Sequence, residues 1–76
     1  MKYPDDDAFI KQVGQQLKLI RKAKKLTQLE VGLRSGLEES AVQRIEAGRI
    51  NSTLKTLLKI VNVLDVEYSA VFDFKQ

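Results

Sequence analysis

The chain has 76 residues and a formal net charge of +3, with 13 lysines and arginines against 10 aspartates and glutamates. It contains no cysteine and no histidine, which excludes a disulfide framework, removes the commonest zinc ligands and leaves no Ser–His or Cys–His catalytic pair. A chain of this length forms one small domain, whose stability must come from a hydrophobic core, with dimerisation as a common further support.

The first predicted helix covers about residues 6–24. Pro4 and the acids Asp5, Asp6 and Asp7 mark its start, because acidic side chains interact favourably with the amino-terminal end of a helix. The helix is predicted to end at Lys24 and Lys25, where cations suit a carboxyl terminus. Its apolar side, at helical spacing, consists of Phe9, Ile10, Val13, Leu17, Ile20 and Ala23.

The charges are unevenly distributed along the chain. Residues 11–25 hold six basic side chains and no acid, whereas residues 60–76 hold three acids and one lysine. Such an asymmetry indicates a polyanionic partner on one face, although a solvated helix face explains a basic run equally well. Charge alone leaves both interpretations open.

The second predicted helix begins with the sequence Thr27-Gln28-Leu29-Glu30. This is a capping box, in which the Thr27 hydroxyl accepts from the Glu30 amide while the Glu30 carboxylate accepts from the Thr27 amide. The helix continues through Val31 and Leu33 and stops at Ser35-Gly36.

The third predicted helix runs from about residue 39 to residue 47. Val42 and Ile45 face inward, Leu37 is the apolar residue of the preceding turn, and Gly48 is the expected breaker. A fourth helix follows the cap Thr53, and its apolar stripe consists of Leu54, Leu57, Leu58, Val61 and Leu64.

Residues 65–67 form a break, and residues 68–72 suggest a last short helix that ends in Phe74. We find no strand pattern, repeat or internal linker. The prediction is therefore one all-α domain over residues 1–76, with a short arm at residues 1–5.

Only about three residues join the second and third helices, and Gly36 lies in the joint. This is the layout of a helix-turn-helix, whose second helix enters the major groove of DNA. Short helix pairs also occur in bundles that bind nothing, so the layout alone is moderately specific.

The stretch LTQLEVGLRSGLEESAVQRIEAGR resembles the phage Cro and repressor family of helix-turn-helix proteins, the XRE family, including the restriction–modification controller type. The matching pieces are Leu26-Thr27-Gln28 with Glu30, Ser35-Gly36-Leu37, and Arg44-Ile45-Glu46 with Gly48. Upstream Val13-Gly14, Leu17-Lys18 and Ile20-Arg21-Lys22 match, as do the downstream residues 53–60, 65–66 and 71–72. The resemblance covers about residues 10–74, and the joint match at the correct spacing is what makes it specific.

The resemblance implies a compact five-helix, lambda-repressor-like domain that binds a two-fold operator as a homodimer. It places Gln28 against the DNA backbone, with a base edge as a further possible contact, and Arg49, Thr53 and Lys55 against phosphates, the latter two beside the outward amides of a helix start. The positions of the recognition helix that face the groove are held by Glu38, Glu39, Ser40, Gln43 and Arg44. It also pairs Arg21 with Glu46 as part of the scaffold. Structural alternatives stand beside these roles: Gln28 as an ordinary first-turn residue and Arg44 as a solvated cation.

The sequence leaves the dimer surface open between the fourth and fifth helices and the chain end. Its candidate residues, which could equally be core, are Val66, Tyr68, Val71, Phe72 and Phe74.

Two adjacent carboxylates, Glu38 and Glu39, depart from the family pattern, which usually has a Ser or Thr cap followed by neutral or basic residues. They could stabilise the helix through its dipole, by about 0.3–1 kcal/mol each. One of them could instead accept from a cytosine amino group and repel misplaced phosphates. A third explanation is that DNA binding is lost. Our hypothesis is that Arg44 supplies specificity and Glu39 tunes it.

The function predicted from the sequence is that of a DNA-binding transcriptional regulator or repressor. The alternative is a protein-interaction module, such as an antitoxin of the same fold. An enzyme is not expected, and neither is a metal or other cofactor. No apolar run is long enough to span a bilayer, and MKYPDDDAF has the wrong charge order for a secretory signal. The absence of cysteine fits a cytoplasmic location.

Overall fold

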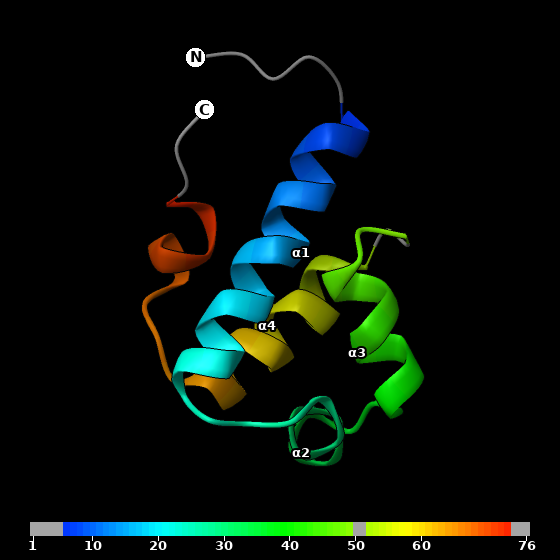
Figure 1. Ribbon diagram of the computed structural model, residues 1–76, viewed down its shortest axis with the longest axis vertical. Coiled ribbons are helices and arrows are strands. Elements are labelled where there is room, and N and C mark those ends of the chain that lie inside the picture. The colour runs from blue at the N-terminus through cyan, green and yellow to red at the C-terminus, as the bar shows by residue number, and fades with distance from the viewer. Residues whose placement is uncertain (1–5, 50–51, 74–76) are drawn as a thin grey trace.

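The computed structural model describes residues 6–49 and 52–73, and within these ranges it contains four α-helices and one short 3-10 helix (Figure 1). The elements are α1 (Asp6–Ala23), α2 (Gln28–Ser35), α3 (Glu39–Glu46), α4 (Leu54–Leu64) and the 3-10 helix η1 (Tyr68–Phe72). The predicted all-α class is confirmed, and the ends of α1 and α3 each lie one residue before the predicted ends. The predicted arm, residues 1–5, and the predicted chain end at Phe74 lie outside the described residues.

The predicted count of five α-helices is wrong in its last element. In η1 the backbone amides of Ala70 and Asp73 donate to carbonyls three residues earlier, on Glu67 and Ala70, at 3.0 and 3.5 Å. This i→i+3 pattern defines a 3-10 helix and is typical of short segments. Five residues make little more than one turn, which gives few i→i+4 bonds the chance to form.

Side-chain caps fix the starts of α2 and α4. The Thr27 hydroxyl oxygen accepts from the Glu30 amide at 3.0 Å, and the Glu30 carboxylate accepts from the Thr27 amide at 2.9 Å. The predicted capping box is therefore confirmed. At α4, Thr53 caps as predicted, since its hydroxyl oxygen accepts from the Thr56 amide at 3.2 Å.

Every helix contributes to one hydrophobic core. The central side chains, each less than one tenth exposed, are Leu17, Val31, Val42, Ile45, Ile60, Val61, Leu64 and Val71. They come from α1, α2, α3, α4 and η1, so the core joins all the elements rather than one helical pair. No described helix is both long and apolar enough to cross a membrane.

Three leucines of the predicted apolar sets are exposed instead of buried. Leu29 and Leu33 of α2 are 49% and 72% exposed, and Leu54 of α4 is 70% exposed. Leu29 and Leu33 stand four residues apart on one side of α2, whereas Val31 and Gly32 occupy the buried side. In a helix of only two turns, the positions of the apolar residues alone do not identify the face that packs on the core.

Gly14 lets α1 approach α3 backbone to backbone. A Cβ atom on Gly14 would lie 2.5 Å from the Ile45 carbonyl oxygen and 2.6 Å from that of Glu46. Both obstacles are main-chain atoms of buried residues, which cannot rotate away as a side chain can. The separation of α1 and α3 therefore depends on the absence of a side chain at this position.

The carboxyl-terminal η1 is held against α1 by polar and aromatic contacts. The Gln16 amide donates to the Ala70 carbonyl at 2.9 Å. The rings of Phe9 and Phe72 stack at a centroid distance of 6.1 Å and an interplanar angle of 14°. These contacts place η1 beside the middle of α1, on the opposite side of that helix from α3 (Figure 1).

Replacing Gly14 with alanine should lower the free energy of unfolding by about 1–3 kcal/mol, because the new methyl group must push α1 and α3 apart. Urea denaturation followed by circular dichroism measures the change. The exposed neighbour gives the control: Gln15→Ala should stay within about 0.5 kcal/mol of the parent protein. Equal stability of the two variants would show that the packing of α1 on α3 does not require glycine at position 14.

The capping box predicts a pH dependence of stability. The hydrogen bond from the Thr27 amide, the Thr27 side chain and the charge of Arg34 together hold the pKa of the Glu30 carboxyl below its ordinary value. A depressed folded-state pKa adds stability that is fully present above the unfolded-state pKa and disappears as the pH falls through the folded-state value. The difference in unfolding free energy between the parent and Glu30→Gln should thus be constant near neutral pH and shrink in acid. A difference independent of pH between neutrality and pH 2 would contradict this.

Candidate nucleic-acid interface

A tight connection joins α2 and α3, at residues 36–38. Gly36 has a φ of 76°, in the left-handed region that favours glycine, and the Leu37 amide donates to the Gly32 carbonyl at 2.8 Å. A Cβ atom on Gly32 would lie 2.7 Å from the Leu37 carbonyl oxygen. The turn therefore folds directly back on α2 and fixes where α3 begins.

A buried ion pair ties α1 to the carboxyl-terminal end of α3. Arg21 donates from Nε to Glu46 Oε2 at 2.6 Å and from Nη2 to Oε1 at 3.0 Å. The side chains are only 8% and 5% exposed. Arg21 Nη1 also donates to the Leu26 carbonyl at 2.8 Å, in the connection to α2. The predicted pairing of Arg21 with Glu46 is confirmed. Arg21 also joins this pair to the α1–α2 connection through its hydrogen bond to Leu26.

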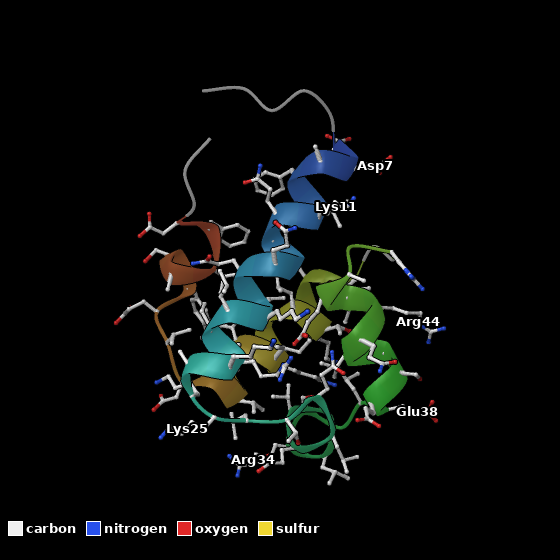
Figure 2. All side chains as sticks on the ribbon, in the orientation of Figure 1. Asp7, Lys11, Lys25, Arg34, Glu38 and Arg44 are labelled. Carbon is white, nitrogen blue, oxygen red and sulfur yellow. The ribbon has the colours of Figure 1, made fainter. Side chains whose placement is uncertain are left out.

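The α3 helix separates its residues into a buried and an exposed face. Val42, Ile45 and Glu46 are buried. Figure 2 shows Glu38 at the start of α3 and Arg44 near its end, both projecting away from the body of the protein. The sequence-predicted residues on this exposed face are Glu38, Glu39, Ser40, Gln43 and Arg44, and Arg49 beyond the helix is exposed as well.

The exposed face is acidic at its start and basic at its end. Glu38 is the N-cap residue of α3, but its side chain makes no capping hydrogen bond, and Glu39 follows in the first turn. At the other end a surface groove is lined by Gln43, Arg44, Ala47 and Arg49. Two guanidinium groups thus border one groove, where they can bind phosphate or the guanine edge.

Lys11 of α1 reaches the basic end of α3, which sequence reasoning missed. A Cβ atom on Gly48 would lie 2.7, 3.1 and 3.2 Å from the Cα, Cβ and Cγ atoms of Lys11. The stem of Lys11 therefore runs against Gly48, beside Arg49. The basic run of residues 11–25 contained the signal, but only the packing of α1 on α3 selects this lysine from the others.

The remaining predicted contact residues lie at helix starts. Gln28, the first residue of α2, is half-buried, and its side-chain amide donates from Nε2 to Glu46 Oε1 at 3.0 Å. Thr53 and Lys55 at the start of α4 are exposed. Since Thr53 already caps the helix through its side chain, what this end offers to an anion is chiefly the Lys55 charge and the first backbone amides.

The candidate dimer residues have different environments. Val71 is 0% exposed, so its side chain belongs to the core of the protomer and cannot contact a partner, which corrects the prediction for this residue. Tyr68 and Phe72 are 54% and 45% exposed, and Val66 is partly buried. Buried and exposed side chains differ within η1 because one side of the short helix packs on α1 and α4. Phe74 lies outside the described residues.

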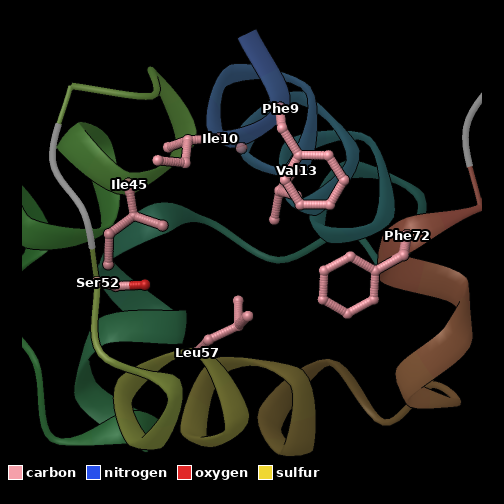
Figure 3. Close-up of a pocket in the computed structure, with 8 residues that line it drawn as sticks. Phe9, Ile10, Val13, Ile45, Ser52, Leu57 and Phe72 are labelled. Atoms are coloured by element: carbon pink, nitrogen blue, oxygen red, sulfur yellow. The ribbon is translucent and has the colours of Figure 1, made fainter. Parts of the chain in front are cut away.

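A small apolar pocket lies between α1, α4, η1 and the buried side of α3, which contributes Ile45 (Figure 3). Its volume is about 130 Å³, and Phe9, Val13, Leu57 and Phe72 are among its lining residues. Ser52 is the only described lining residue with a polar side chain. The described lining residues therefore include no carboxylate or basic side chain.

The model of the family HTH_3, helix-turn-helix, matches residues 17–71 of the chain. The immunity repressor protein of Bacillus phage phi105 is 39% identical over 59 residues, which are 78% of this chain and 41% of that protein. The HTH-type transcriptional regulator y4dJ of Sinorhizobium fredii is 38% identical over 58 residues, covering 76% of this chain and 75% of that protein.

A solved structure has a similar fold and sequence. It is the restriction–modification controller protein C.AhdI of Aeromonas hydrophila, with a TM-score of 0.82 and 37% identity, covering 86% of this chain and 98% of that one. The similarity thus extends over a whole controller protein, whereas the chain spans less than half the length of the phage repressor.

Replacing Arg21 with methionine should lower the free energy of unfolding by about 3–5 kcal/mol, because it leaves the Glu46 carboxylate buried without a cation. Its exposed neighbour gives a matched control that removes the same charge: Lys22→Met should change stability by about 0.5 kcal/mol or less. Urea unfolding of both variants gives the comparison. A loss below about 1 kcal/mol for Arg21→Met would mean that the pair is not important for the fold.

Proposed function

The chain belongs to the HTH_3 helix-turn-helix family, and on this premise we propose that it is a sequence-specific DNA-binding transcriptional regulator. It binds a two-fold operator as a homodimer, with α3 as the recognition helix in the major groove. The observation that carries the proposal is the division of α3: Val42, Ile45 and Glu46 are buried, while its other polar side chains are exposed beside the α2 connection. A helix held this way can enter a groove without unfolding any part of the core.

Contacts to the DNA backbone come from residues around α3. Gln28 at the start of α2, Arg49 after α3, and Thr53 and Lys55 at the start of α4 bind phosphates. Lys11, whose stem packs against Gly48, adds a further cation. Each cation that neutralises a phosphate releases counterions, so affinity should fall steeply as salt rises. These contacts set the register of α3 in the groove but carry no sequence information themselves.

The exposed face of α3 contacts the base edges. Arg44 is the principal reader, because a guanidinium can donate two hydrogen bonds to the O6 and N7 atoms of guanine. Glu39 tunes the choice of sequence, either by accepting from a cytosine amino group or by repelling phosphates in a wrong register. The carboxylates also interact favourably with the helix dipole, so the two roles are compatible.

A homodimer supplies the second reading helix that selectivity requires, because one short helix contacts too few base pairs. The exposed Tyr68 and Phe72 and the partly buried Val66 are the interface residues that we propose. The same exposed aromatic side chains support the alternative function, a module that chiefly binds a partner protein. A repressor role is suggested by the similarity to the phage repressor.

In vitro selection from random duplex DNA tests the proposal. Enrichment of a palindromic sequence would support sequence reading and two-fold symmetry together. Absence of enrichment at low salt would contradict the proposal and favour the protein-binding alternative.

Replacing Arg44 with alanine should weaken binding to the selected duplex by about 1–3 kcal/mol and relax one base position per half-site. Fluorescence anisotropy with duplexes that vary each position measures both effects. The control Arg34→Ala removes the same charge from the exposed end of α2 and should keep full selectivity. Unchanged affinity and selectivity in Arg44→Ala would remove Arg44 from the reading role.

Replacing Glu39 with glutamine separates the explanations for the acidic start of α3. Tuning by repulsion predicts tighter binding to random DNA and a smaller ratio of specific to non-specific affinity. A role confined to the helix dipole predicts an unchanged ratio with a stability loss of about 0.3–1 kcal/mol. The control is Glu67→Gln, because Glu67 is an exposed acid between α4 and η1 and its replacement changes the net charge by the same amount.

A further inference from the structure

The Glu46 carboxylate accepts hydrogen bonds from two other helices at once. Arg21 of α1 donates to both of its oxygens, at 2.6 and 3.0 Å, and Gln28 of α2 donates to Oε1 at 3.0 Å. Three of the roughly four acceptor sites of a carboxylate are thus used. Because Glu46 is only 6% exposed, these protein donors take the place of water.

The hydrogen bond from Gln28 to Glu46 fixes the orientation of the Gln28 side-chain amide. An amide group that donates to an anion has its nitrogen facing that anion, which settles the orientation of a group whose two ends are otherwise nearly equivalent. Gln28 has one further N–H, and its side chain is half-buried rather than enclosed. One end of the amide is therefore held by the scaffold while its second donor remains available to an outside acceptor.

The charges near this amide favour a phosphate as that acceptor. A bare carboxylate beside Gln28 would repel an anion, but the Glu46 charge is neutralised by Arg21 through two hydrogen bonds. The Gln28 amide also stands at the first turn of α2, where the helix dipole attracts negative charge. A phosphate can therefore approach without facing an uncompensated negative charge.

We propose that Glu46 is a positioning residue for DNA binding: through its hydrogen bond it holds the Gln28 amide in the orientation that donates to a backbone phosphate. This inference rests on the proposed function. It gives the buried ion pair a role beyond the scaffold, because the same carboxylate that joins α1 to α3 also orders a contact at the start of α2 before DNA arrives. A preordered side chain loses less freedom on binding than a mobile one.

A double-mutant cycle tests the proposal. The variant Arg21→Met with Glu46→Met removes both buried charges together, a replacement that proteins often tolerate without loss of stability, and it leaves the Gln28 amide without its acceptor. Affinities for the selected duplex are measured for the parent, this pair variant, Gln28→Ala and the triple variant, with folding of each checked by urea denaturation.

The expected result is a loss of roughly tenfold for Gln28→Ala in the parent, typical of a hydrogen bond to a charged group. The pair variant should lose a similar factor, and adding Gln28→Ala to it should then cost less than about twofold. An equal loss from Gln28→Ala in both backgrounds would overturn the proposal. Arg49→Ala is the control, since its effect should be the same in both backgrounds.

A second measurement holds even if the pair variant does not fold. Side-chain amide NMR relaxation of the parent protein without DNA should show a restricted Gln28 amide with an order parameter near that of the backbone, while the exposed Gln43 amide is mobile. A Gln28 amide as mobile as that of Gln43 would overturn the proposal. If the parent bound no DNA at low salt, the proposed function would fail, whereas full DNA binding by Gln28→Ala would overturn the phosphate contact of Gln28 and the role of Glu46 but leave recognition by α3 standing.

Discussion

The buried carboxylate of Glu46 is the point on which the arrangement of the helix-turn-helix depends. A charge with 6% exposure must be compensated inside the protein, and its compensation comes from Arg21 of α1 and Gln28 of α2. Arg21 in turn holds the Leu26 carbonyl in the α1–α2 connection. The end of α3, the end of α1 and the start of α2 are therefore fixed relative to one another by a single hydrogen-bonded group.

Close backbone packing complements this polar constraint. Gly14 brings α1 against the carbonyls of Ile45 and Glu46, and Gly48 continues the contact along Lys11. The carboxyl-terminal end of α3 is thereby packed against α1 on its buried side, whereas its amino-terminal end, with Glu38 and Glu39, faces outward. This asymmetry makes the charge on α3 uneven: the acids stand at the free end, and the cations gather where α3 meets α1. Non-specific attraction to DNA should therefore be weak for a protein of this class, and binding should depend on the register of α3.

Local sequence rules predicted those features that are formed by neighbouring residues. The capping box at Thr27 and Glu30, the cap Thr53 and the turn at Gly36 all require only a few consecutive residues, and all are present. The ion pair of Arg21 with Glu46 came from the family resemblance. The exposure of Leu33, the burial of Val71 and the contact of Lys11 with Gly48 depend on which faces pack together, which no short window contains. The hydrogen bond from Gln28 to Glu46 joins residues 18 positions apart and was missed for the same reason.

Methylation interference on the selected duplex tests the central claim most directly. Methylation of guanine N7 alters the major groove, where we propose that α3 lies. The account predicts that interfering guanines form two half-sites with centres about 34–36 Å apart, on one face of the DNA. The interference at one guanine in each half-site should disappear in Arg44→Ala. Interference that is absent from the major groove, or that stays unchanged in this variant, would contradict recognition by α3.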